Sequence, residues 1–143
     1  MSVLVDTGIF YAYQNKKANR YKLAKKAMKK ILEGELSQPW ITDYIYDEVI
    51  TLTKTKTGNF EQVKSISKRI LGKKDFYSPF KLEFISKKEF KEAKRLLFKY
   101  NDQSLSFTDL TTIATTRENK IDGVLSFDSD FDGIIKRFRP KNL

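Results

Sequence analysis

Short apolar segments alternate with longer amphipathic ones along this chain, and this alternation restricts its possible folds more than any other feature. The apolar segments have the character of strands: Val3-Leu4-Val5, Trp40-Ile41-Thr42, the alternating Phe80, Leu82 and Phe84, and residues 123–127. Between them, apolar residues recur at helical spacing within 21–32, 43–55, 60–70, 90–97 and from 108 onward. Such alternation is typical of a mainly parallel sheet between layers of helices. We therefore predict a three-layer α/β/α domain with four to five strands, spanning residues 1–143 as one domain.

The chain contains no histidine and no cysteine, and this excludes several kinds of active site. A Ser-His-Asp triad, a Cys-His nucleophile and acid–base catalysis by histidine all need these residues. Zinc sites also rely mainly on histidine nitrogen and cysteine sulfur. A catalytic metal ion in this chain must therefore be held by oxygen ligands, which favours Mg²⁺ or Mn²⁺.

Lysine and arginine number 28 against 18 aspartates and glutamates, which gives a formal net charge of +10. This excess favours a polyanionic partner, with nucleic acid ahead of an anionic membrane surface, although a lysine-rich surface also serves solubility or heat tolerance. The candidate phosphate contacts lie on one helical stripe and near the C-terminus: Lys22, Lys25, Lys26, Lys29, Lys30, Lys136, Arg137 and Arg139. For the stripe, a simply solvated helix face is an equally open reading.

Nothing in the sequence indicates a membrane protein. No apolar run approaches the roughly 20 residues that a membrane-spanning helix needs. The N-terminus also lacks the basic-then-apolar pattern of a signal peptide. We therefore expect a cytoplasmic location, with which the absence of cysteine is compatible.

Three carboxylates stand in positions that need an explanation. Asp6 directly follows an apolar strand, so it must cap a helix, meet a cation or carry a desolvation cost. Glu48 shares a helix face with Ile45 and Leu52, where a lone glutamate is unusual unless it lies at the edge of the apolar stripe or meets a lysine. Asp109 lies in the first turn of a predicted helix, where an acid also opposes the helix dipole or closes a capping box.

A fourth group of acids follows the last strong strand, in the loop from Asp128 to Gly133. This loop begins like a calcium-binding EF-hand, with acids at positions one, three and five and glycine at six. Its twelfth position is Arg139, however, where the EF-hand needs a bidentate glutamate. We therefore interpret it as an acid-rich loop at the carboxyl end of a strand, where α/β folds bind ligands.

Brought together without a cation, these four acids would repel one another and raise one another's pKa values. A divalent ion resolves that conflict, and the lack of histidine and cysteine restricts it to an ion that prefers oxygen. We therefore predict that Asp6, Glu48, Asp109 and one acid of the 128–132 loop are metal ligands.

At these residues the chain resembles the PIN-domain nucleases, a family that includes the VapC-type toxins of prokaryotic toxin–antitoxin pairs. Four segments carry the resemblance in order: VLVDT at 3–7, TDYIYDE at 42–48, LSFTD at 105–109 and VLSFDSDF at 124–131. Their order and spacing extend over essentially the whole chain, and its length suits one such domain. The resemblance implies a parallel sheet and Mg²⁺- or Mn²⁺-dependent cleavage of RNA.

Carried over by position, Asp6, Glu48 and Asp109 match the core acids of that family, and Asp128 best matches its more variable fourth acid, with Asp130 as the alternative. Their predicted role is to hold the metal and thereby to catalyse hydrolysis.

The resemblance also implies residues and partners beyond the acids. Thr7 and Thr108 stand beside core acids and could orient a ligand or water, although threonine in a first helical turn also has an ordinary capping role. A homodimer and a cognate antitoxin protein are further implied. Exposed aromatic side chains could contribute to the dimer contact, and the sequence does not separate contact from core among the five candidates: Phe10, Tyr11, Tyr13, Tyr44 and Tyr46.

Other readings of the sequence remain open. A non-catalytic RNA- or protein-binding module could share this fold, and a PIN nuclease could act in RNA processing rather than as a toxin. Two further designs fit less well. A nuclease of the Asp…Glu-x-Lys type would have to use Glu118 and Lys120 at the end of a helix, and a haloacid-dehalogenase-type phosphatase needs an aspartate where Gly8 stands.

Overall fold

The computed structural model describes residues 1–143, and it confirms the α/β architecture. Its centre is a five-stranded sheet in the order β3-β2-β1-β4-β5, in which every pair of neighbouring strands is parallel. The strands are β1 (Ser2–Val5), β2 (Gln38–Thr42), β3 (Lys81–Glu83), β4 (Gly123–Leu125) and β5 (Arg137–Phe138). The middle strand β1 is the first in the chain, and the later strands lie on both sides of it.

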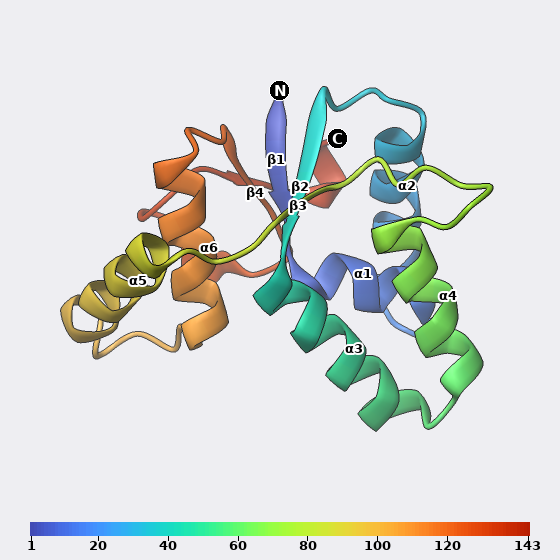
Figure 1. The fold of residues 1–143 in the computed structure, drawn as a ribbon, viewed down its shortest axis with the longest axis horizontal. Helices are drawn as coiled ribbons and strands as arrows, with labels where there is room; N and C mark the ends of the chain where they lie inside the picture. The colour runs from blue at the N-terminus through green and yellow to red at the C-terminus, as the bar shows by residue number, and fades with distance from the viewer.

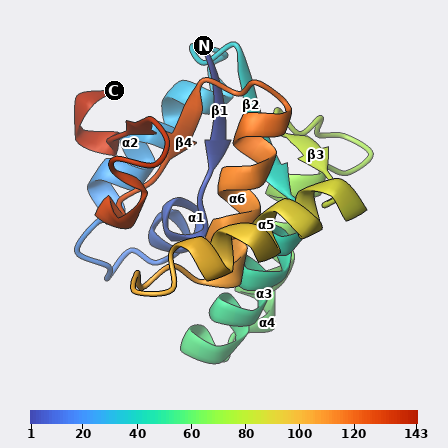
Figure 2. The same ribbon diagram turned by 90° about the vertical axis from the view of Figure 1, so that its left-hand side faces the viewer.

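Six α-helices surround this sheet (Figure 1). They are α1 (Thr7–Gln14), α2 (Tyr21–Leu32), α3 (Asp43–Thr57), α4 (Phe60–Leu71), α5 (Lys87–Lys99) and α6 (Phe107–Glu118). Helices α5 and α6 cover one face of the sheet, whereas α1, α2 and α4 lie on the other side (Figures 1 and 2). In Figure 1, helix α3 extends from the lower edge of the sheet toward α4. No helix is long and apolar enough to span a membrane.

The apolar core is divided by the sheet into two clusters. The larger one contains all of the apolar residues of β1 together with residues of α1, α2, α3 and α4, including the fully buried Phe10 and Met28. The smaller one joins α5 and α6 to Val124 of β4 and to Phe131. Both faces of β1 are buried. This explains why its residues form an unbroken apolar run in the sequence.

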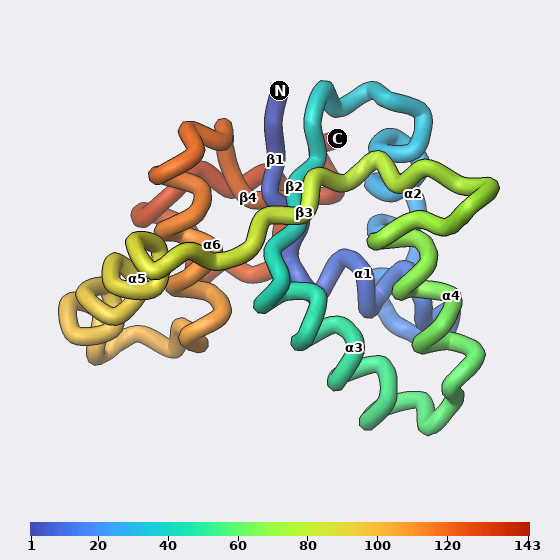
Figure 3. The backbone as a smooth tube through the Cα atoms, in the orientation of Figure 1, coloured from blue at the N-terminus to red at the C-terminus, as the bar shows by residue number.

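Local signals in the sequence set most helix ends. Helix α3 ends before Gly58, which adopts the left-handed conformation with φ of 59°, and Asn59 then caps α4 through its side chain. Ser86 opens α5 with the predicted capping box to Glu89. Figure 3 traces the connections between these elements, including the longer loop of residues 72–80 between α4 and β3.

Several residues predicted to face the core lie outside it. Leu23, Phe90 and Leu97 are 37%, 44% and 42% exposed, because α2 and α5 turn their neighbouring residues inward instead. In α5 the inward residues are Ala93 and Leu96, which pack against α6. Phe10, which we considered for a dimer contact, is instead fully buried.

The topology creates a crevice at the carboxyl edge of the sheet. After β1 the chain moves to β2 on one side, and only later returns to β4 on the other side of β1. The carboxyl ends of β1 and β4 are therefore adjacent, with Val5 in register with Leu125 and the Asp6 amide donating to the Leu125 carbonyl at 3.1 Å. In open α/β sheets such a switch point is the usual place for a ligand.

Candidate active site

The four acids singled out in the sequence line one pocket of about 530 Å³ at this edge of the sheet. Asp6 follows β1, Glu48 lies on α3, Asp109 lies in the first turn of α6, and Asp128 follows β4. The other lining residues are Thr7, Gly8, Arg20, Ser106, Ser126, Phe127 and Ser129. The fold thus gathers four acids that are far apart along the chain, and we call this space the acidic pocket.

Asp6 is the most deeply placed of these acids, with 8% of its surface exposed. Its carboxylate accepts a hydrogen bond from the Thr7 amide at 2.9 Å and another from the Ser126 hydroxyl at 2.6 Å. Asp6 is therefore the N-cap of α1 and a pocket residue at once. Burial is the main cause that raises its pKa from 3.8 to about 6; the nearby charges of Asp109 and Glu48 act in the same direction, and the two hydrogen bonds oppose them.

Asp109 is fixed by the capping box at the start of α6. The Ser106 amide donates to its carboxylate at 2.9 Å, and its own amide donates to the Ser106 hydroxyl at 3.0 Å. Burial raises the pKa of Asp109, and the charges of Asp128 and Glu48 act in the same direction. The capping interpretation of this residue is thus correct, and it places the carboxylate toward the pocket as well.

The two candidate acids of the loop after β4 lie in different surroundings. Asp128 lines the acidic pocket, whereas Asp130 does not. The Asp130 amide donates to the Asp128 carboxylate at 2.8 Å, and the Asp128 amide donates to the Ser126 hydroxyl at 2.9 Å. Ser126 therefore links the loop to Asp6, and this link holds Asp128 rather than Asp130 beside the other acids.

The donor set of the acidic pocket suits a divalent cation that prefers oxygen. It holds four carboxylates with no lysine among them, and the buried Thr7 hydroxyl beside Asp6 has no hydrogen-bond partner in the protein. As the side chains stand, however, no group of three acids is close enough to hold one ion together. The residue types fit such an ion, and joint coordination requires the carboxylates to move toward one another.

Three lining residues were not foreseen from the sequence. Ser126 directly follows β4 and Ser106 is the N-cap of α6, so both look like ordinary structural serines. Arg20 is an exposed residue at the start of α2, and its guanidinium lies 4.9 Å from the centre of the Phe127 ring. Only the position of Ser126 directly after a buried strand could have indicated it. Thr108, in contrast, does not line the pocket, and its carbonyl accepts from the Thr111 hydroxyl.

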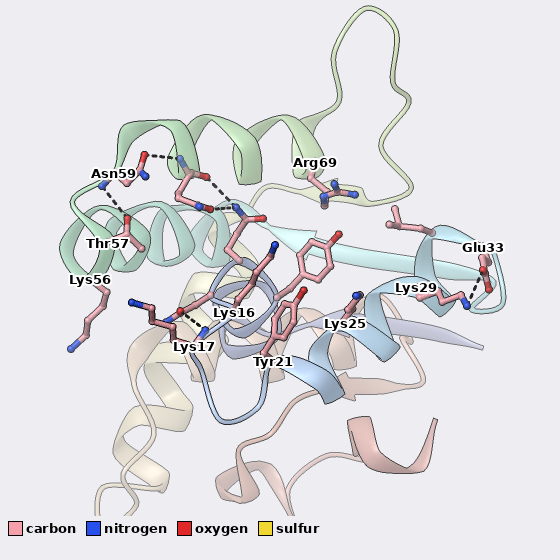
Figure 4. A pocket seen from close by; sticks show the side chains of 15 residues that line it. Lys16, Lys17, Tyr21, Lys25, Lys29, Glu33, Lys56, Thr57, Asn59 and Arg69 are labelled. Carbon is pink, nitrogen blue, oxygen red and sulfur yellow. Dashed lines mark hydrogen bonds and ion pairs between the residues drawn. The ribbon is translucent and has the colours of Figure 1, made fainter.

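The predicted basic contacts differ in their surroundings. The Arg137 side chain is only 7% exposed, and its guanidinium donates to the Asp132 carboxylate through two bonds of 2.8 Å and to the Ser126 carbonyl at 3.2 Å. It therefore braces the loop after β4. On α2, Lys25 and Lys29 line a second, larger cavity away from the acids (Figure 4), whereas Lys30 faces Glu35 at 3.7 Å.

Three solved structures share this fold. VapC20 of Mycobacterium tuberculosis, described as a toxin that cleaves the sarcin–ricin loop, superposes with a TM-score of 0.77 at 21% identity, covering 93% of this chain and 96% of that one. FitAcB of Neisseria gonorrhoeae gives 0.70 at 16% identity over the whole of both chains. VapBC2 of Rickettsia felis, bound to a DNA fragment from its promoter, gives 0.67 at 16% identity, covering 97% and 100%.

At these levels of identity the superpositions establish the fold. A comparison with curated protein sequences gives no significant match. The family described as the PIN domain, however, matches residues 3–136, which include all four acids of the pocket. Both the sequence match and the five-stranded parallel sheet with its acid-lined carboxyl edge therefore lead to the same assignment: this chain belongs to the PIN domain family.

Proposed function

We propose that this protein is a metal-dependent endoribonuclease that uses Mg²⁺ or Mn²⁺ in the acidic pocket. The observation that carries the proposal is the gathering of four carboxylates from separate segments around one pocket. Mutual repulsion and burial make this arrangement unfavourable for the protein alone, as the raised pKa of Asp6 indicates. A site that is unfavourable without a cation is a natural place to bind one.

In this proposal, Asp6, Glu48, Asp109 and Asp128 hold the ion. When bound, the ion supplies Lewis acidity, which lowers the pKa of water and screens charge on the phosphate oxygens. Hydrolysis places the water oxygen on phosphorus and breaks the bond to the 3′ oxygen, which leaves a 5′-phosphate and a 3′-hydroxyl.

The other residues of the pocket hold or orient its carboxylates. The Thr7 amide and the Ser126 hydroxyl fix Asp6, and the capping box with Ser106 fixes Asp109. Glu48 has no hydrogen bond to another side chain and is half-buried on α3, so its longer side chain is free to approach the others. Arg20, exposed at the pocket, can offer its charge to a substrate phosphate.

The proposal is tested by incubating the purified protein with structured RNAs in Mn²⁺ and, in parallel, in a chelator. We expect cleavage only with the metal, and we expect Asp6→Asn and Asp109→Asn to lose at least 100-fold in rate. Mn²⁺ should also raise the melting temperature of the wild type but not that of Asp6→Asn. If Mn²⁺ changes neither property and RNA still binds, the protein is a binding module without catalysis.

We further propose a toxin role with an antitoxin partner, because the superposed VapC20 is described as a toxin and the four sequence segments resemble toxins of toxin–antitoxin pairs. Expression of the wild-type chain in a bacterial host should then stop growth, whereas Asp6→Asn should not. Normal growth together with metal-dependent RNA cleavage in vitro would instead favour a nuclease of RNA processing.

A homodimer is the third part of the proposal. Phe98 is 68% exposed, and Phe90 and Leu97 of the same helix α5 are 44% and 42% exposed, so this helix presents an apolar surface that water disfavours. Phe98→Glu should therefore give a monomer in size-exclusion chromatography with light scattering. Phe60→Glu, at a 65% exposed position on α4, is the matched control and should leave the oligomeric state unchanged. A wild type that is monomeric at all concentrations contradicts this part.

A further inference from the structure

A second cavity of the molecule is basic and lies apart from the acidic pocket (Figure 4). It has a volume of about 1060 Å³ and lies between the end of α1, the loop that follows it, α2, and the facing parts of α3 and α4. Six cationic side chains line it, against the single acid Glu33: Lys16, Lys17, Lys25, Lys29, Lys56 and Arg69. We call it the basic cavity.

Most of this positive charge is not neutralised within the protein. Of the six cations only Lys29 has a carboxylate within 4.0 Å, which belongs to Glu33. Arg69 forms no ion pair, and its buried Nε has no hydrogen-bond acceptor. A guanidinium without an acceptor gains more from a bound anion than one that is already paired. The cavity therefore favours an anionic ligand.

Aromatic rings accompany the cations. The Arg69 guanidinium lies 5.2 Å from the centre of the Tyr13 ring, and the Lys25 ammonium lies 5.9 Å from that of Tyr21. Figure 4 shows Lys16, Tyr21 and Lys25 reaching into the space below Arg69. Aromatic side chains beside lysine and arginine are the combination that binds single-stranded nucleic acid, since bases stack while the phosphates meet charge.

The lining argues against a protein partner in this cavity. Only three of its fifteen lining residues are hydrophobic, whereas the centre of a protein–protein interface is depleted in charge and rich in apolar area. Lysine in particular is rare at such centres. A flexible, strongly charged ligand that keeps much of its hydration fits this lining better.

The basic cavity is connected to the acidic pocket by one short stretch of chain. Lys16 and Lys17, directly after α1, line the basic cavity, and Arg20 in the same connection lines the acidic pocket. Helix α1 also joins them, with Thr7 at the acidic end and Gln14 at the basic end. Eight helical residues span about 12 Å, a length that a few nucleotides of one RNA strand can bridge.

We propose that the basic cavity binds single-stranded RNA a few nucleotides away from the bond that is cut in the acidic pocket. This inference rests on the proposed ribonuclease function and adds a second contact to it. The cavity would hold phosphates through Lys16, Lys25 and Arg69 and would stack a base on Tyr21. Affinity then comes from this cavity, because the acidic pocket by itself repels RNA.

The test measures binding of a fluorescein-labelled 20-nucleotide single-stranded RNA of mixed sequence by fluorescence anisotropy. A chelator is present so that no RNA is cut, and the salt concentration is varied from 50 to 200 mM. The double variant Lys16→Glu/Lys25→Glu should lower the slope of log affinity against log salt by about 1.4, or about 0.7 for each lost phosphate contact. Tyr21→Leu, which changes no charge, should weaken binding at least about fivefold.

The control is Lys74→Glu/Lys94→Glu, which makes the same change in net charge at exposed lysines outside the cavity. Because all four lysines are exposed, both double variants should keep the wild-type melting temperature. The inference is overturned if the two double variants have the same slope, or if Tyr21→Leu binds RNA like the wild type. It is also overturned if the cavity variants lose binding of a polyglutamate peptide while RNA binding is unchanged, since the ligand is then an acidic protein segment.

These outcomes are separable from failure of the proposed function. If the wild type cleaves RNA in Mn²⁺ but the cavity variants bind RNA like the control, the cavity inference alone is wrong. If no RNA is cleaved in Mn²⁺ but the cavity variants lose RNA binding, the ribonuclease proposal alone is wrong and the cavity remains an RNA site.

Discussion

Replacing Asp6 by asparagine should stabilise the metal-free protein at neutral pH, although it removes a central acid of the pocket. Burial raises the pKa of Asp6 from 3.8 to about 6, so the folded protein binds this proton more tightly than the unfolded chain does. Stability is therefore greatest below pH 3.8 and falls as the pH rises through the interval up to about 6. At 1.36 kcal/mol per pH unit the loss is about 3 kcal/mol at pH 7.5.

Asparagine keeps the shape of the side chain and avoids this cost. Its carbonyl can still accept from the Thr7 amide, which lies 2.9 Å away in the wild type. The Ser126 hydroxyl, now 2.6 Å from the second carboxylate oxygen, would face an amide nitrogen, which costs about 1 kcal/mol. The net gain is therefore about 2 kcal/mol, or roughly 4–8 °C in melting temperature for a domain of this size.

The assay is thermal unfolding in a chelator at pH 7.5 and at pH 4. At pH 4 the ionisation cost of Asp6 shrinks to about 0.5 kcal/mol, so the advantage of asparagine should disappear. Asp75→Asn, at an exposed position, is the control and should change stability by no more than about 0.5 kcal/mol at either pH. A destabilised Asp6→Asn at pH 7.5, or a gain of equal size at pH 4, would refute the reasoning.

Three further predictions concern the pocket and the sheet behind it. Asp128→Asn should reduce metal-dependent RNA cleavage at least tenfold while Asp130→Asn remains close to the wild type, and the reverse order in a cleavage assay would reassign the fourth acid. Ser126→Ala should cost about 1–3 kcal/mol in chemical denaturation at pH 7.5, because it removes a donor from the buried Asp6 carboxylate. Gly123→Ala should cost on the order of 1–3 kcal/mol, since its new methyl group would lie 2.6 Å from the Lys136 carbonyl oxygen. Gly8→Ala, whose nearest neighbour would be 3.8 Å away, should unfold at the wild-type denaturant concentration or above it, and equal losses at both glycines would contradict the packing argument.

The structural features that depend on residues close together in the chain could be predicted from the sequence. Helix α2 occupies residues 21–32 as its apolar spacing predicts, and the capping residues Asn59 and Ser86 open the helices that follow them. These features form through contacts within a few residues, so the local sequence contains nearly all the information needed. The order of strands and helices likewise led to a parallel sheet, because each β-α-β connection has few ways to pack.

The acids of the pocket could also be predicted from the sequence, because their conflict with neighbouring residues is local. Asp6 and Glu48 conflict with their apolar surroundings, and such a conflict is visible without coordinates. The sequence could not separate capping from a pocket role for Asp6 or Asp109, and the structure gives both roles to each. A carboxylate at the start of a helix and near the end of a strand can cap the helix and line the pocket from the same position.

Only the tertiary structure decided which groups meet across the sheet. It placed Asp128 in the acidic pocket and left Asp130 outside. The Asp128 amide donates to the Ser126 hydroxyl, and that hydroxyl donates to Asp6, which lies 120 residues earlier in the chain. It also turned α5 so that Phe90 faces outward, and it joined the ends of α1 and α2 to both pockets. These outcomes depend on the packing of β1 between β2 and β4 and on the rotation of each helix against the sheet. Contacts between distant segments set such packing, and no local pattern of residues encodes it.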